Sequence, residues 1–194
     1  MLRLEKHYGM SRATLERIGA FIVMWALFEN QLETALWRLT GENPNGVRPS
    51  TDAVPVTALI SRFREETSGA AGDDWRMVVD LICETAGCLA EYRNAIAHGQ
   101  LLPASVGGGS ILNARWHGEQ RKREPVTAHL DENLVGSMLD ALQELLICMQ
   151  AIVFDDAPPF SNPRILERQQ PLRRARSLAG EIRHLTALMN HEKY

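Results

Sequence analysis

Hydrophobic residues recur at three- and four-residue steps over a long stretch near the start of the chain. The pattern begins after Ser11, a suitable helix N-cap, and continues to Gly41. This spacing places the apolar side chains on one face of an α-helix. Residues 42–51 contain prolines, asparagines and a glycine that indicate a loop, and residues 52–67 predict a shorter helix.

A third amphipathic helix is predicted from Asp73, another suitable cap, to His98. Arg93 lies on its apolar stripe, among the core-facing positions. Gly99 follows directly, and we expect it to end the helix in the left-handed conformation that glycine favours. The stripe consists of Trp75, Val78, Val79, Ile82, Ala86, Leu89, Arg93 and Ile96.

The segment 103–130 has a residue pattern that is not helical. Three consecutive glycines precede two short β-prone runs, Ile111 to Trp116 and Val126 to Leu130, which are separated by a polar turn. This arrangement predicts a two-stranded hairpin. Asp131 then caps a fourth amphipathic helix, which ends at the proline-containing segment 155–163.

These elements predict an all-α protein: an up-and-down four-helix bundle, with a small β-hairpin insert between the third and fourth helices and a C-terminal helical tail. We expect residues 1–156 to form the bundle, with the insert at about 103–130, and residues 157–194 to form the tail. The tail carries a weaker stripe of leucine and isoleucine, which favours docking on the bundle or on a second chain.

The charge of the chain is unevenly distributed. Residues 157–194 hold seven Arg or Lys and three acidic residues, or +4, so residues 1–156 carry −7 of the total of −3. The whole chain therefore has no electrostatic preference for nucleic acid, and any such binding must come from a local patch.

Several bulk features narrow the class of protein. The three cysteines, Cys83, Cys88 and Cys148, form neither a CxxC pair nor zinc-site spacing and are typical of core residues in a reducing compartment. The longest apolar run, Ala20 to Phe28, is well short of the roughly 20 residues that span a membrane. We expect a cytoplasmic protein with no metal, no cofactor and no membrane partner.

Arg93 and His98 carry the clearest chemistry in the sequence. Five residues apart on a helix, they are separated by about 7.5 Å along the axis and about 140° around it. His98 sits near the helix C-terminus, where the helix dipole favours a cation. A fixed guanidinium beside a proton donor or acceptor is what RNA cleavage without a metal requires.

The string from Tyr92 to Gly99, YRNAIAHG, resembles the signature of the HEPN superfamily (higher eukaryotes and prokaryotes nucleotide-binding domains), in which an Arg and a polar residue precede a His. Arg93, Asn94 and His98 match those positions. The resemblance implies a four-helix bundle that dimerises so that both motifs face one cleft. In many members this cleft is a metal-independent endoribonuclease site, often in toxin–antitoxin or antiviral systems.

Each residue of the motif also has a structural interpretation, which for His98 is a hydrogen bond to the last carbonyls of the helix. Arg93 can pair with a buried acid, for which Glu29, near the core face of the first helix, is the candidate. In the functional interpretation Glu29 instead orients Arg93 or His98. Asn94 either caps a helix of the neighbouring chain, binds a phosphate oxygen or holds His98, and Tyr92 either packs or stacks on a base.

Basic residues outside the motif give further candidate RNA contacts. Arg121, Lys122 and Arg123 occupy the predicted hairpin tip, where they form either a solvated turn or a contact with phosphates entering the cleft.

Two functions therefore follow from the sequence. The first is a homodimeric endoribonuclease that leaves 2′,3′-cyclic phosphate ends, with His98 as general acid or base, Arg93 stabilising the phosphorane and Asn94 positioning the phosphate. An antitoxin would be a further partner. The alternative is a dimeric module that binds a nucleotide or a partner without turnover.

Overall fold

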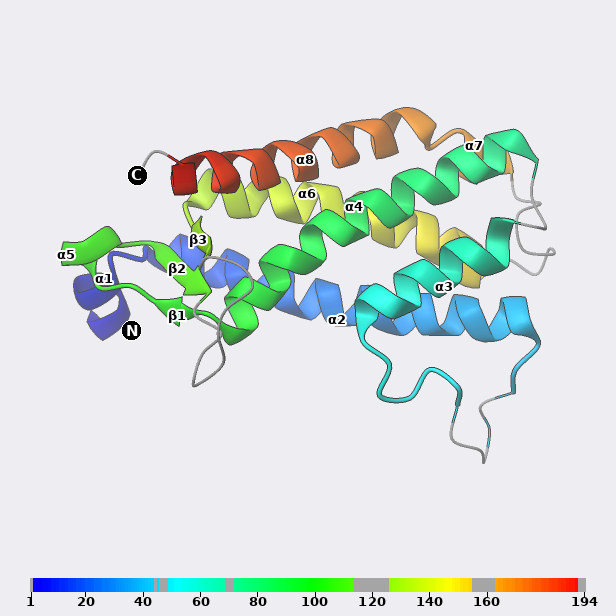
Figure 1. Ribbon diagram of the computed structural model, residues 1–194, viewed down its shortest axis with the longest axis horizontal. Helices are drawn as coiled ribbons and strands as arrows, with labels where there is room; N and C mark the ends of the chain where they lie inside the picture. The colour runs from blue at the N-terminus through cyan, green and yellow to red at the C-terminus, as the bar shows by residue number, and fades with distance from the viewer. Residues whose placement is uncertain are drawn as a thin grey trace.

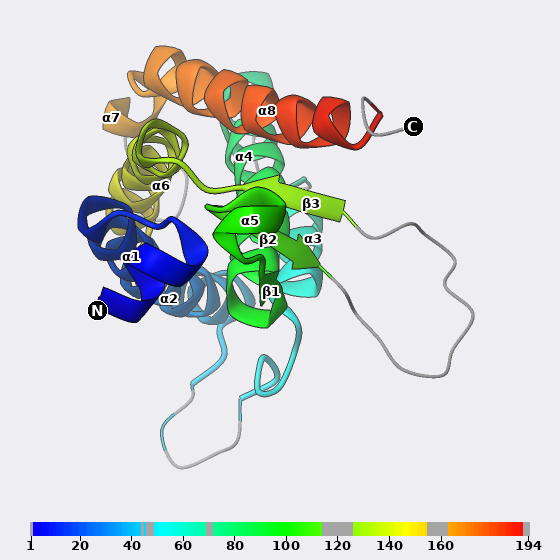
Figure 2. The ribbon, with the colours of Figure 1, turned by 90° about the vertical axis from the view of Figure 1, so that its left-hand side faces the viewer.

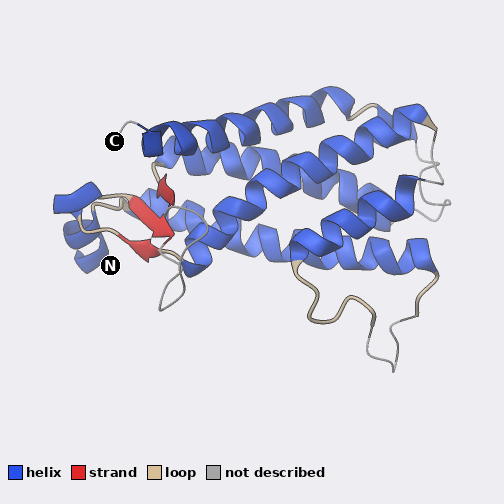
Figure 3. Ribbon diagram, viewed as in Figure 1, coloured by secondary structure: helices blue, strands red, loops and turns tan. Residues whose placement is uncertain are grey.

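A computed structural model describes residues 2–43, 45, 49–68, 72–113, 126–154 and 163–191. The protein is mostly helical, with one small sheet near one end (Figures 1 and 3). The elements are, in order, α1 (Leu2–Tyr8), α2 (Arg12–Thr40), α3 (Val56–Ser68), α4 (Asp73–His98), β1 (Gln100–Leu101), α5 (Ala104–Gly107), β2 (Ser110–Asn113), β3 (Val126–His129), α6 (Glu132–Val153), α7 (Pro163–Leu166) and α8 (Gln169–His191).

Helix α6 lies between α2 and α8, and it also contacts α4 (Figure 2). Its own sequence is apolar enough to face three neighbours. By length and composition, Glu132–Val153 would also suffice to cross a membrane, yet half of its most apolar window is buried inside the structure. The buried residues of α6 are Val135, Met138, Ala141, Leu142, Leu145, Leu146, Cys148, Met149 and Ile152.

Helix α2 forms as its sequence predicts. The Ser11 side chain accepts a hydrogen bond from the backbone N–H of Thr14 at 3.0 Å, which satisfies one of the unpaired donors at the helix start. Gly41 ends the helix with φ 68°, a left-handed conformation that costs glycine little. The buried face carries three large aromatic residues, Phe21, Trp25 and Phe28, directed into the core.

Helices α2 and α3 run in the same direction, because the chain returns along α2 before α3 begins (Figure 1). The returning segment is held against α2 by Trp37, whose indole donates to Thr51 at 3.0 Å, and by Thr51, which donates to Glu33 at 3.1 Å. The predicted up-and-down order is therefore not confirmed at this step.

The predicted hairpin is present as β2 and β3, which pair antiparallel from Ser110 opposite His129 to Asn113 opposite Val126. A third strand, β1, was not predicted; it pairs with β2 directly after α4. Helix α1 was also not predicted. Both are explained by a second, smaller hydrophobic cluster at this end of the molecule, centred on Met10, Ile111, Leu130 and Val135.

The C-terminal segment shares the main core of the protein. Helices α7 and α8 bury Ile165, Leu172, Ala175, Ala179 and Ile182 in the same cluster as α2, α4 and α6. The stripe that predicted docking of the tail is thus directed onto the bundle.

One arginine on α8 and one in the turn before α8 each pair with a carboxylate of the bundle. Arg176 donates to Glu84 on α4 at 2.8 Å, and Arg168 pairs with Glu144 on α6. Their charge is therefore directed at the body of the protein.

Gly99 corrects one expectation. Its φ of −82° and ψ of 165° are extended, not left-handed. Glycine is required there by close packing: a Cβ atom would lie 2.1 Å from Cγ2 of Ile111 and 2.3 Å from the carbonyl oxygen of Ala95. The end of α4 therefore approaches the sheet so closely that only a residue without a side chain fits.

We expect Gly99→Ala to destabilise the protein by about 1–3 kcal/mol, because the methyl group forces the helix end and β2 apart. Gly87→Ala is the matched control. Gly87 lies within α4 with no atom within 4 Å of its added Cβ, so alanine there should be neutral or stabilising by up to about 1 kcal/mol. Urea unfolding of both variants checks this, and equal stabilities would contradict the packing explanation.

Candidate functional site

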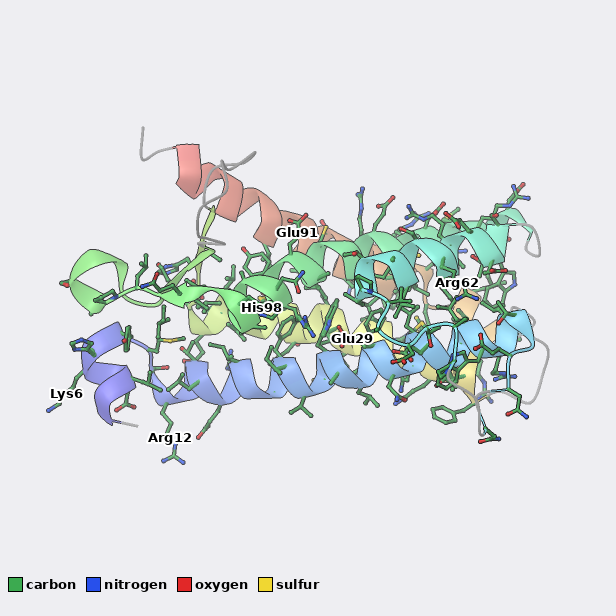
Figure 4. All side chains as sticks on the ribbon, turned by 60° about the horizontal axis from the view of Figure 1, so that its bottom comes forward. Lys6, Arg12, Glu29, Arg62, Glu91 and His98 are labelled. Carbon is green, nitrogen blue, oxygen red and sulfur yellow. The ribbon has the colours of Figure 1, made fainter. Side chains whose placement is uncertain are left out.

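The motif residues occupy the last turns of α4, before the chain enters β1. Arg93 and Asn94 are partly buried and His98 is exposed. Figure 4 labels Glu29 on α2, beside α4, and labels Glu91 and His98 on the C-terminal part of α4. His98 is thus open to solvent, and Arg93 and Asn94 keep partial contact with it.

An ion pair links Arg93 to α2. Its Nη2 lies 3.4 Å from Oε1 of Glu29, with 29% of the arginine side chain and 26% of the glutamate side chain exposed. The structure therefore brings together the two residues that the sequence suggested as partners. Because both side chains retain solvent contact, the pair neutralises Arg93 without sealing it inside the protein.

Asn94 is the second partner of Arg93. Nη1 of Arg93 donates a hydrogen bond to Oδ1 of Asn94 at 3.1 Å. With its oxygen engaged, Asn94 has its amide N–H donors left for another acceptor. Arg93 and Asn94 together therefore present N–H groups, the kind of donors that bind phosphate oxygens.

Trp25 contributes a contact that sequence reasoning missed. Its indole Nε1 donates to Oε1 of Glu29 at 2.6 Å. The signal was present in the sequence, since positions 25 and 29 are four apart and so neighbours on one helix face. It was obscured because Trp25 is also a core residue, exposed by only 1%.

His98 stands apart from this network. Within the part of the chain that the structure describes, no hydrogen bond or ion pair joins it to Arg93, Asn94 or Glu29. Its position on the last turn of α4 leaves the imidazole exposed. The side chain is therefore available to a molecule that approaches from solvent.

Tyr92 packs into the protein. It is 4% exposed, and its hydroxyl donates to the backbone carbonyl of Ile182 on α8 at 2.8 Å. Burial raises the pKa of the Tyr92 phenol above its usual range. Stacking on an RNA base, one of the two roles considered, is inconsistent with this burial.

Three predicted RNA contacts, Arg121, Lys122 and Arg123, lie outside the described residues. Among the residues that are described, no three His, Cys, Asp or Glu side chains gather where they could hold a metal ion.

A hollow of about 1150 Å³ lies between α3, α4 and α8. Its lining includes Glu84, Gly87 and Glu91 of α4 and Glu181 of α8, but none of the motif residues. Arg64 and Arg176 also line it, but its four glutamates outnumber them, which disfavours RNA binding there. Arg93, which pairs with Glu29 of α2, is directed away from this hollow.

The chain has no match among protein-family profiles, characterised proteins or solved structures. The site offers a held guanidinium, amide donors and an exposed imidazole at one helix end.

We expect Tyr92→Phe to lower the free energy of unfolding by about 1 kcal/mol, because it removes the hydrogen bond between α4 and α8. Tyr8→Phe is the control: Tyr8 is half-buried, and no hydrogen bond from its hydroxyl is found in the described structure, so the change should stay within about 0.5 kcal/mol.

The difference between wild type and Tyr92→Phe should depend on pH. A raised pKa in the folded state means that the neutral phenol contributes stability below the unfolded pKa of about 10, and that this contribution is lost as pH rises further. Above about pH 10 the wild-type protein therefore loses stability that its phenol had contributed, whereas Tyr92→Phe has no such group to titrate. The difference in free energy of unfolding between the two proteins shrinks accordingly. Urea unfolding at pH 8 and pH 11 measures it; a constant difference contradicts burial of this phenol.

Proposed function

We propose that this protein is a metal-independent endoribonuclease of the HEPN type that works as a homodimer. The observation that carries the proposal is the placement of Arg93, Asn94 and His98 at one accessible helix end, with Glu29 holding Arg93. In this proposal α2, α3, α4 and α6 correspond to the HEPN bundle, and α8 is an addition packed on it. A cytoplasmic location and an antitoxin partner belong to the same proposal.

The reaction requires one proton to leave the RNA 2′-hydroxyl and another to reach the departing 5′-oxygen. The 2′-oxygen forms a bond to phosphorus, the bond from phosphorus to the 5′-oxygen breaks, and a 2′,3′-cyclic phosphate remains. His98 transfers a proton as general acid or base. Arg93 stabilises the negative charge of the phosphorane, and the amide of Asn94 positions a phosphate oxygen.

A dimer supplies the second proton-transfer group that one chain lacks. A single His98 serves one of the two proton transfers, so a second copy of the motif in the same cleft would serve the other. Helix α2 also exposes an apolar face, in which Val23 is 71% and Leu27 is 45% exposed. Exposed apolar side chains at this spacing support contact with another chain. The remaining members of this face are Gly19, Ala20 and Ala26.

The alternative function is a dimeric module that binds a nucleotide or a partner without turnover. The Glu29–Arg93 pair favours it, because a carboxylate that neutralises the arginine also weakens its attraction for phosphate. In that case Arg93→Ala damages folding or dimerisation, and His98→Ala is nearly silent.

We expect the purified protein to cleave RNA in the presence of EDTA and to leave 2′,3′-cyclic phosphate ends. His98→Ala should lower the rate by about 100-fold or more, the size typical of a lost general acid or base. His7→Ala, an exposed histidine on α1, is the control and should retain the wild-type rate. Gel analysis of labelled RNA with end-group mapping checks both.

The outcome separates the two functions. Absence of cleavage by the wild type at every pH tested, or an unchanged rate in His98→Ala, rules out the nuclease and leaves the binding module. Circular dichroism of each variant shows whether a lost rate reflects lost folding.

We expect the wild type to have about twice the chain mass of 21.7 kDa in solution. Introducing Glu at positions 23 and 27 should shift it to the monomer, because two buried carboxylates oppose an apolar interface. Phe154→Glu, which changes a similarly exposed apolar side chain (74%) at the C-cap of α6, should leave the mass unchanged. Light scattering after size-exclusion chromatography measures the mass of each protein in solution. A monomeric wild type contradicts the shared cleft.

A further inference from the structure

Trp25 is held rigidly beneath the motif. Its ring is 1% exposed and packs against Phe21 and Phe28, with ring centroids at 6.2 Å and 5.3 Å. A buried indole enclosed by aromatic neighbours on its own helix has little freedom to rotate. The direction of its N–H is therefore fixed by the hydrophobic core.

One oxygen atom connects this core to the motif. Oε1 of Glu29 accepts the indole N–H at 2.6 Å and lies 3.4 Å from Nη2 of Arg93. A hydrogen bond to an ionised acceptor is stronger than one between neutral groups. Because 26% of the Glu29 side chain is exposed, this bond restrains a side chain that would otherwise sample several rotamers.

We propose that Trp25 is a positioning residue for Arg93. The core fixes the indole, the indole N–H fixes the Glu29 carboxylate, and the carboxylate fixes the guanidinium, which in turn donates to Asn94 at 3.1 Å. The inference rests on the proposed function only in that the fixed Arg93 serves RNA cleavage. The restraint itself exists with or without turnover.

A purely structural role for Trp25 makes a different prediction. A buried indole N–H needs an acceptor, and a Trp25 that only satisfied this need would affect stability without affecting Arg93. The two roles are therefore separated by observing Arg93 directly.

The test uses Trp25→Phe, which keeps an aromatic ring and removes the N–H. Its control is Phe21→Leu, a core change one helical turn away that removes no hydrogen bond from the network. If Trp25→Phe does not fold, β-(3-benzothienyl)alanine at position 25 replaces it, since this residue keeps the bicyclic shape and has sulfur where tryptophan has N–H.

The first measurement is independent of activity. Solvent exchange of the Arg93 guanidinium protons, followed by NMR in the full-length protein, should become about tenfold faster on loss of the indole N–H, the size expected for one hydrogen bond to a charged group. In Phe21→Leu it should stay within about twofold. Unchanged exchange on loss of the N–H, or equal acceleration in both variants, overturns the proposal.

The second measurement uses RNA cleavage. Loss of the indole N–H should lower kcat by about tenfold with KM within about twofold, whereas Phe21→Leu should lower stability and retain kcat. In an Arg93→Lys background the same change should have no further effect on kcat, because the residue it positions is gone. Additive effects overturn the inference. A wild type that does not cleave RNA overturns the proposed function, and the exchange measurement then decides the role of Trp25.

Discussion

The burial of α6 on more than one side is the constraint on which the rest of the structure depends. A helix that is apolar over so much of its surface must be covered by several other helices. Helix α2 covers one side and α8 covers another. The two ends of the chain are thereby drawn onto one core, and α4, which carries the motif, is packed against α6 and α8.

The long elements could be predicted because their signals are local. Ser11 and Asp131 cap α2 and α6 through hydrogen bonds to Thr14 and Leu134, and apolar periodicity marks the faces between caps and ends. Short elements depend on distant contacts instead. Strand β1 forms because β2 supplies its partner, and position 99 has no room for a side chain because Ile111 occupies the adjacent space.

The site was predictable to the same extent. The pairing of Glu29 with Arg93 follows from two helix stripes facing one core, and Asn94 is adjacent in sequence. The indole of Trp25 was overlooked because a residue can belong both to the core and to a polar network, and periodicity reports only the first. The seam between α2 and α4 therefore joins an apolar interior to an accessible cation within a few side chains.

The hydrogen bond from Tyr92 to Ile182 has a consequence for the order in which the protein is made. Synthesis proceeds from the N-terminus, so the motif on α4 leaves the ribosome well before residue 182 does. Until then Tyr92 lacks its acceptor, and the faces of α4 and α6 that α8 later buries remain open to water. The motif helix thus gains its final packing only after α8 has left the ribosome, which delays completion of the site until well after the motif itself has been synthesised.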